Sequence, residues 1–256
     1  MTQDHKTKPV VVWITGASQG IGEALALAMA KQGMTVLASA RNHEHLANLV
    51  DKSKNLPGQI LAYPLDITDQ SVVNGIVEKM MEDHGRIDQA ILNAGTYIPI
   101  PAESFNSHDV RQQVELNIMG TSYCIEALLP DMIQRGQGLI AINASLAGYR
   151  GLPKAAGYGA TKAALINMAE SLHSELSDHG IHFKVINPGF VKTPLTDKNT
   201  FPMPFLIDSD EAASIIIKGL ASKRFEIRFP RIFAAIMGTL RHLPYALYFP
   251  IARKVR

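Results

Sequence analysis

Short runs of apolar residues recur along the chain with no polar alternation inside them. They occupy residues 10–14, 35–40, 89–94, 139–144 and 183–187. A strand that is covered on both faces needs apolar side chains at successive positions, whereas a strand with one wet face alternates. The runs therefore predict strands in the interior of a parallel sheet.

Segments with helical periodicity separate these runs. They span residues 21–32, 43–54, 71–84, 107–135 and 158–179, and a further helix at 209–222 precedes a short strand at 226–229. Alternation of strand and helix is typical of an α/β fold in which right-handed crossovers place helices on both faces of one sheet. We expect a doubly wound parallel sheet.

Length, charge and cysteine content narrow the class of protein. A chain of 256 residues that is 46% hydrophobic is sufficient for one domain with a substantial core, and no linker divides it. The formal charge of +2 argues against a nucleic-acid partner. The single cysteine, Cys124, fits a reducing cytoplasm, and we expect neither a signal peptide nor a membrane span.

A glycine-rich loop, TGASQGIG at residues 15–22, joins the first strand to the first helix. Gly16, Gly20 and Gly22 permit a tight turn and let backbone N–H groups approach a pyrophosphate at the helix N-terminus. Because the loop lies between a buried strand and a helix, it predicts a dinucleotide site more strongly than an ordinary turn.

The end of the second strand indicates which dinucleotide is bound. A carboxylate there would hold the adenosine ribose hydroxyls, but Ala40 and Arg41 occupy these positions. A guanidinium can pair with a 2′-phosphate, so the residues favour NADP over NAD, the alternative being that Arg41 is only a solvated charge. Asp66 could accept a hydrogen bond from the adenine amino group or begin the next helix.

Tyr158 and Lys162 lie four residues apart in the segment YGATK. On a helix they would share one face, about 6 Å apart along the axis. A phenol with a pKa near 10 needs a downward shift of roughly three units, about 4 kcal/mol, to act near neutrality, and an ammonium about 4 Å away supplies a similar energy. Lys162 is therefore expected to lower the pKa of Tyr158, so that the phenol can exchange a proton with an oxygen atom of the substrate. Ser145, at a strand end, is expected to hydrogen-bond that oxygen.

These motifs resemble the short-chain dehydrogenase/reductase family. The resemblance rests on TGASQGIG, Asp66, Asn93-Ala94-Gly95, Asn117, Ser145, YGATK and NPGFVKTP at 187–194, in order over about residues 9–225. It implies a single-domain Rossmann fold of about seven strands, with a catalytic tetrad of Asn117, Ser145, Tyr158 and Lys162. The cofactor-binding residues implied by the loop and the resemblance are Gly16, Ser18, Gly20, Ile21, Gly22, Arg41, Asp66, Asn93, Ala94, Gly95, Tyr158, Lys162, Pro188, Gly189, Val191 and Thr193.

The resemblance also implies a reaction and an assembly. Tyr158 would protonate a carbonyl or deprotonate an alcohol during hydride transfer with NADP(H), and Asn117 would hold a proton-relaying water; no metal is expected. The alternative is a non-catalytic NAD(P)-binding regulatory or scaffold protein. The family usually pairs its long helices across a two-fold axis, which implies a homodimer or homotetramer.

Substrate choice is expected to depend on residues 195–207, interpreted as a flap, and on residues beside the tetrad. The latter are Tyr97, Leu146, Tyr149 and Leu152. Their largely apolar character favours a hydrophobic ketone, aldehyde or alcohol over a sugar or small acid.

The C-terminal residues 231–256 depart from the usual ending of the family. We interpret them as a helical extension of the domain at 1–230, broken by Pro244 and Pro250, within a basic region whose balance over 223–256 is +7. One helical face would carry Ile232, Phe233, Ile236, Met237 and Leu240, bordered by Arg231 and Arg241. Such a helix could cover the active-site mouth or a second subunit, which we favour, or make peripheral contact with an anionic membrane.

Overall fold

The computed structural model describes residues 9–198 and 202–254. Seven parallel strands form one sheet in the order β3-β2-β1-β4-β5-β6-β7. Their bounds are β1 Val11–Thr15, β2 Thr35–Ser39, β3 Gln59–Ala62, β4 Gln89–Leu92, β5 Gly138–Asn143, β6 Ile181–Pro188 and β7 Glu226–Phe229. The order reverses between β1 and β4, so the predicted doubly wound Rossmann sheet is confirmed.

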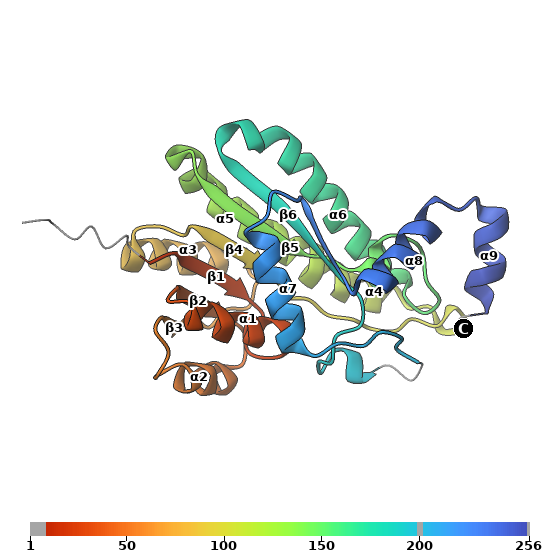
Figure 1. Cartoon of the computed structure of the whole chain (residues 1–256), viewed down its shortest axis with the longest axis horizontal. Coiled ribbons are helices and arrows are strands. Elements are labelled where there is room, and N and C mark those ends of the chain that lie inside the picture. Colours follow the sequence, from red (N-terminus) through yellow and green to blue (C-terminus); the bar gives the residue numbers. More distant parts are fainter. Residues whose placement is uncertain (1–8, 199–201, 255–256) are drawn as a thin grey trace, which may run out of the picture.

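Helices cover both faces of the sheet (Figure 1). Apolar residues of α1 (Gly20–Lys31), α2 (His43–Lys52) and α7 (Ser209–Leu220) pack in one core cluster. Those of α3 (Gln70–His84), α5 (Gly120–Arg135) and α6 (Ala156–Leu176) pack in the other. The five interior strands β1, β2, β4, β5 and β6 carry mostly buried residues, as unbroken apolar runs require.

Local signals set several helix ends. Asp69 accepts hydrogen bonds from the backbone N–H groups of Ser71 and Val72 and so caps α3. Gly33 follows α1 with a φ of 83°, a conformation that glycine adopts without a Cβ clash.

The predicted single helix at 107–135 is wrong in its middle. The chain forms α4 (Ser107–Val114), then a π-helical segment, Glu115–Met119, and only then α5. Asn117 lies in the π-helical segment. A π-bulge adds one residue to a turn and redirects the side chains that follow, and such bulges are frequent at functional sites.

Two further helices follow β7 and stand at the carboxyl edge of the sheet, α8 (Arg231–His242) and α9 (Tyr245–Arg253) (Figure 1). Pro244 separates them as predicted, but Pro250 lies inside α9 and does not break it. The expected apolar face of α8 is divided. Met237 is buried in the core, whereas Ile232 and Ile236 are exposed.

Candidate active site

The glycine loop forms the floor of a cavity of about 370 Å³ at the point where the strand order reverses. Gly16 and Gly20 have φ values of 65° and 58°. A Cβ on Gly22 would lie 2.2 Å from the carbonyl oxygen of Gly16, and one on Gly16 would lie 2.8 Å from the Cα of Ala94. The loop therefore needs glycine at these positions to bring backbone groups close to a ligand.

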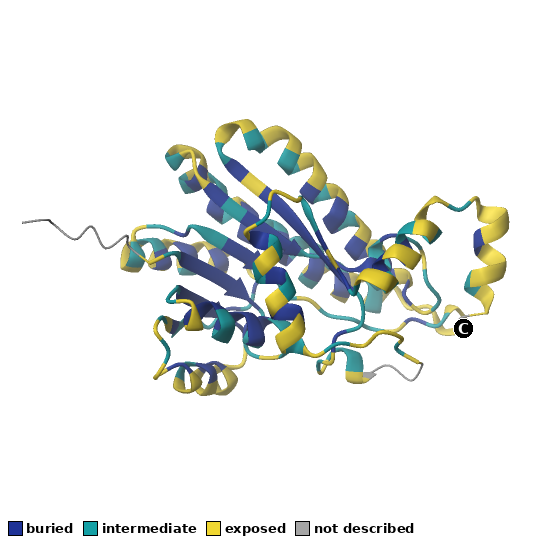
Figure 2. Ribbon diagram, viewed as in Figure 1, coloured by how far each residue is buried: buried dark blue, intermediate teal, exposed yellow. Residues whose placement is uncertain are grey.

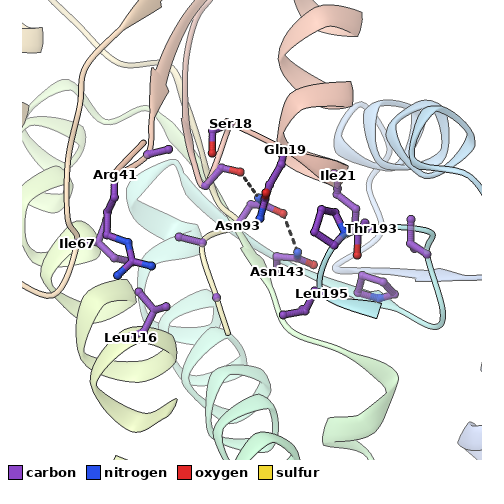
Figure 3. Close-up of a pocket in the computed structure, with 18 of the residues that line it drawn as sticks. Ser18, Gln19, Ile21, Arg41, Ile67, Asn93, Leu116, Asn143, Thr193 and Leu195 are labelled. Atoms are coloured by element: carbon purple, nitrogen blue, oxygen red, sulfur yellow. Dashed lines mark hydrogen bonds between the residues drawn. The ribbon is translucent and has the colours of Figure 1, made fainter. Parts of the chain in front are cut away.

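All the predicted cofactor residues except Gly22 line this cavity. The lining includes Gly16, Ser18, Gly20, Ile21, Arg41, Asp66, Asn93, Ala94, Gly95, Ser145, Tyr158, Lys162, Pro188, Gly189, Val191 and Thr193. Gly22 supports the loop from within α1. Figure 3 shows Arg41 at one side of the cavity and Ile21, Thr193 and Leu195 at the other.

Asn93 joins the glycine loop to the centre of the sheet. Its Nδ2 donates to the carbonyl oxygens of Thr15 and Gly16, each at 3.1 Å, and its Oδ1 accepts from Asn143 Nδ2 at 2.8 Å. The dashed lines in Figure 3 mark part of this network. Asn93 thus holds β1, β4 and β5 together at the edge where the cavity opens.

Ser145 and Tyr158 meet at the same edge. Ser145 follows β5 and Tyr158 lies in the first turn of α6. The Ser145 hydroxyl donates to the carbonyl oxygen of Pro188 at 3.3 Å and lies close enough to the Tyr158 phenol to lower its pKa. Ser145 Oγ also accepts from the N–H of Ala147 at 3.1 Å, which fixes its rotamer. The Tyr97 ring packs edge-on against the Tyr158 ring, with centroids 5.1 Å apart.

Lys162 lies one turn beyond Tyr158 on α6 and is almost fully buried. Its Nζ donates to the carbonyl oxygen of Asn143 at 2.7 Å and lies 5.5 Å from the centroid of the Tyr158 ring. Tyr158 and Lys162 therefore share one face of the helix and both reach the cavity.

Asn117 approaches this group from the π-helical segment. Its side chain exchanges hydrogen bonds with the backbone of Thr96 at 2.8 and 3.0 Å and donates to Thr161 Oγ1 at 3.0 Å. A Cβ on Gly95 would lie 3.3 Å from Asn117 Oδ1 and 3.4 Å from Lys162 Nζ, so Gly95 lies between these side chains. The four predicted tetrad residues are brought into one region of the structure.

The pKa values of Tyr158 and Lys162 are each shifted by burial, and the shift of Tyr158 is opposite to our expectation. Burial raises the pKa of Tyr158 to about 12, although the Ser145 hydroxyl opposes the shift. Burial also lowers the pKa of Lys162 to about 8. The expected lowering of the Tyr158 pKa by Lys162 is therefore wrong for the protein's own groups, because desolvation of the phenol is the largest cause of its shift and Lys162 is not among the causes.

Some predicted substrate residues lie elsewhere. Leu146 is buried in the core, and the Tyr149 hydroxyl donates to Glu226 at the base of the C-terminal helices. Tyr97, Leu146, Tyr149 and Leu152 are all outside the lining of the described cavity. Of the expected flap, Leu195 does line it, and residues 199–201 lie outside the described residues.

Asn143 is the residue that the sequence reasoning missed. Its side chain holds Asn93 and its carbonyl holds Lys162. A polar residue at the end of an otherwise apolar strand was the available signal. Asn42 and His45, which line the cavity next to Arg41, were also missed.

The comparisons with known proteins agree with this geometry. The family described as short chain dehydrogenase matches residues 10–202. An uncharacterized oxidoreductase of Myxococcus xanthus is 34% identical over 95% of this chain and 96% of its own. A 3-oxoacyl-[acyl-carrier-protein] reductase of Thermotoga maritima is 34% identical over 73% of this chain and 76% of its own.

Among solved structures, ElxO with NADP bound has a TM-score of 0.77 and 27% identity, covering 86% of this chain and 97% of that chain. Sequence and fold thus agree on one assignment. The chain belongs to the short-chain dehydrogenase/reductase family, and it is an NAD(P)-dependent oxidoreductase acting on CH–OH donors.

Proposed function

We propose that this protein interconverts a hydrophobic ketone or aldehyde and its alcohol with NADP(H), and that Tyr158 is the general acid and base. The observation that carries the proposal is that Ser145 and Tyr158 both line the glycine-loop cavity, with the serine hydroxyl close enough to the phenol to lower its pKa. Two hydroxyls that converge on one point can bind a single substrate oxygen and exchange a proton with it.

The cavity fits a nicotinamide dinucleotide. Gly16, Gly20 and Gly22 leave room for the pyrophosphate at the N-terminus of α1, and Val191 and Thr193 are proposed to contact the carboxamide. When bound, the cofactor supplies or accepts the hydride.

The raised pKa of Tyr158 fixes its protonation state before the cofactor binds, and action near neutrality would require that pKa to fall when cofactor and substrate bind. With a pKa of about 12, the phenol is protonated at neutral pH and ready to donate to a carbonyl oxygen. Ser145 would orient that oxygen, and Lys162, whose pKa is about 8, would remain charged and hold the ribose. Both Nδ2 protons of Asn117 are donated to Thr96 and Thr161, so its side chain could take part in a proton relay only as an acceptor, through the second lone pair of Oδ1.

Arg41 supports the preference for NADP. Its side chain is 70% exposed at the cavity rim, and its only described ion pair is with Asp66, at 3.8 Å. Such a long, solvated contact contributes little, so Arg41 is available to a 2′-phosphate. The NADP bound by the related ElxO agrees with this proposal.

The proposal of a hydrophobic substrate rests on one residue of the cavity wall and on a relative. Leu195, from the segment expected to choose the substrate, is apolar and lines the cavity. The related reductase of Thermotoga maritima is named for a 3-oxoacyl group, which joins a ketone to an alkyl chain. We therefore propose carbonyl compounds with an extended alkyl chain.

The test is NADPH consumption by the purified full-length protein with a series of ketones and aldehydes of increasing chain length. We expect turnover that increases with chain length. Tyr158→Phe should lower kcat by roughly 10² to 10⁴-fold, because only the proton-transferring hydroxyl is removed. NADPH binding, followed by nucleotide fluorescence, should change little.

Two results would contradict the proposal. An unchanged rate in Tyr158→Phe would exclude the assigned acid, and NADPH binding without turnover of any carbonyl would favour the non-catalytic alternative.

A further inference from the structure

The C-terminal helices expose an unusual share of apolar surface. Much of α8 and α9 is exposed (Figure 2). Six of the eleven exposed large apolar side chains among the described residues belong to these two helices. They are Ile232, Ile236, Tyr245, Leu247, Phe249 and Ile251. We call this set the tail patch. Exposed apolar side chains that gather on two consecutive helices indicate a binding surface more strongly than isolated ones do.

Contacts with Arg150 and Gly151 hold the helices that carry the tail patch, and one member of the patch, Tyr245, takes part in them. Arg150 lies between the rings of Tyr245 and Tyr248, 4.5 and 4.6 Å from their centroids, and donates to the carbonyl oxygens of Arg241 and Leu243. The Tyr248 hydroxyl donates to the carbonyl oxygen of Gly151. Since these bonds anchor the turn between α8 and α9, the exposed side chains belong to a docked element.

The same helices carry only positive formal charge. Between residues 231 and 254 there is no Asp or Glu, and the cationic residues are Arg231, Arg241, Arg253 and Lys254. Apolar and cationic side chains combined on short helices are typical of segments that lie in the headgroup region of an anionic bilayer.

The tail patch adjoins the segment that borders the cavity. Phe233 of α8 stacks on Phe190, with ring centroids 5.3 Å apart, and lies 6.3 Å from the ring of Phe205. Phe205 and Leu206 are themselves exposed. The exposed apolar surface therefore extends from α8 toward the side of the cavity formed by Val191 and Thr193.

We propose that α8 and α9 dock this protein on the surface of a membrane that contains anionic lipid. Among the described residues, no helix has the length and apolarity to cross a bilayer, so the helices would lie along the surface. A second copy of the chain fits this patch less well, because a two-fold contact would place two acid-free cationic faces together. The proposal does not depend on the substrate.

Flotation of the full-length protein with phosphatidylcholine vesicles, with and without 30% phosphatidylglycerol, tests the proposal. We expect the protein to float with the anionic vesicles at low salt and to float less with the neutral ones. Added salt should reduce binding without abolishing it, since apolar burial is only weakly sensitive to salt.

Two variants separate the contributions. Leu247→Ser combined with Phe249→Ser should reduce the bound fraction at least tenfold, and Arg253→Gln combined with Lys254→Gln should remove the preference for anionic vesicles. Ile133→Ser is the matched control, because Ile133 is 46% exposed on α5, outside the tail patch. NADPH binding, measured for each variant, shows that the fold persists.

Three results would overturn the proposal. The first is failure of the intact protein to float with anionic vesicles at low salt. The second is a loss of binding in Ile133→Ser as large as that in the tail-patch variant. The third is a wild-type oligomer that does not bind vesicles and that, by sedimentation velocity, is dissociated by the tail-patch substitutions, which would assign the patch to a second subunit.

Discussion

The Nζ atom of Lys162 lies 5.5 Å from the centre of the Tyr158 ring, yet burial moves the pKa of each side chain away from ionisation. The phenol is held neutral and the ammonium is made easier to deprotonate. Because burial causes both shifts, a charged ligand that enters the cavity would change both pKa values.

The first prediction concerns the pH dependence of NADPH use. The Lys162 charge is present below its pKa of about 8 and is lost above it, whereas Tyr158 stays protonated up to about 12. In the reductive direction, kcat/KM for NADPH should therefore be level below pH 8 and then fall by up to tenfold per pH unit. Lys162→Arg should remove that alkaline limb, because an arginine stays charged. If the wild type and Lys162→Arg show the same fall above pH 8, the fall arises from the titration of a group other than Lys162.

The second prediction concerns stability. In the folded state the pKa of Lys162 is about 8, below the ordinary 10.5, so the unfolded chain binds more protons between these pH values. Folding stability from this group therefore increases as pH rises through that window and is lost as pH falls toward 8. Relative to Lys162→Met, the wild type should gain about 3 kcal/mol between pH 8 and 10.5. Urea unfolding of both proteins at pH 8 and at pH 10.5 measures this gain. A difference in unfolding free energy that is the same at both pH values would contradict the prediction.

The third prediction concerns cofactor choice. Arg41→Gln should weaken NADPH binding by roughly 10- to 100-fold and leave NADH binding unchanged, since only NADPH carries the 2′-phosphate. Lys52→Gln is the control, because it changes the net charge by the same amount at a position on α2 where Lys52 pairs with Glu23. It should change the binding of neither NADPH nor NADH. Titration of nucleotide fluorescence checks both. Equal losses for NADPH and NADH in Arg41→Gln would show that the guanidinium does not read the phosphate.

The fourth prediction concerns the glycine loop. In Gly22→Ala the new methyl would lie 2.2 Å from the Gly16 carbonyl oxygen, so the loop must shift, at a cost of about 1–3 kcal/mol and with weaker NADPH binding. Gly75→Ala on α3 is the control. Its methyl would meet nothing within 4 Å, and it should stabilise the protein by about 0.5–1 kcal/mol. Thermal unfolding and NADPH titration distinguish the two, and a tolerated Gly22→Ala would exclude the packing argument.

The sheet and its interior strands were predictable because a strand that is buried on both faces needs an unbroken run of apolar residues. Strand β3 was not predicted from such a run, since it lies at the sheet edge and only Ile60 of its four residues is buried. The interruption around Asn117 was also not predicted, because a change of period over only five residues, Glu115–Met119, does not stand out against the helices on both sides.

The position of the site residues was predictable where it follows from topology. Ser145 follows a strand and Tyr158 begins a helix, so both reach the carboxyl edge. The direction of Tyr149 was not predictable, since it depends on Glu226, which is distant in sequence and adjacent in the fold. The ionisation of Lys162 likewise depends on how deeply the fold buries it.

The contacts of Arg150 with the C-terminal helices connect these helices to the active-site loop. Arg150 lies in the loop whose two ends hold the Ser145 and Tyr158 hydroxyls. A surface that restrains the tail therefore also restrains this loop. If the tail docks as proposed, binding of the tail would therefore change the mobility of the loop that lies between Ser145 and Tyr158.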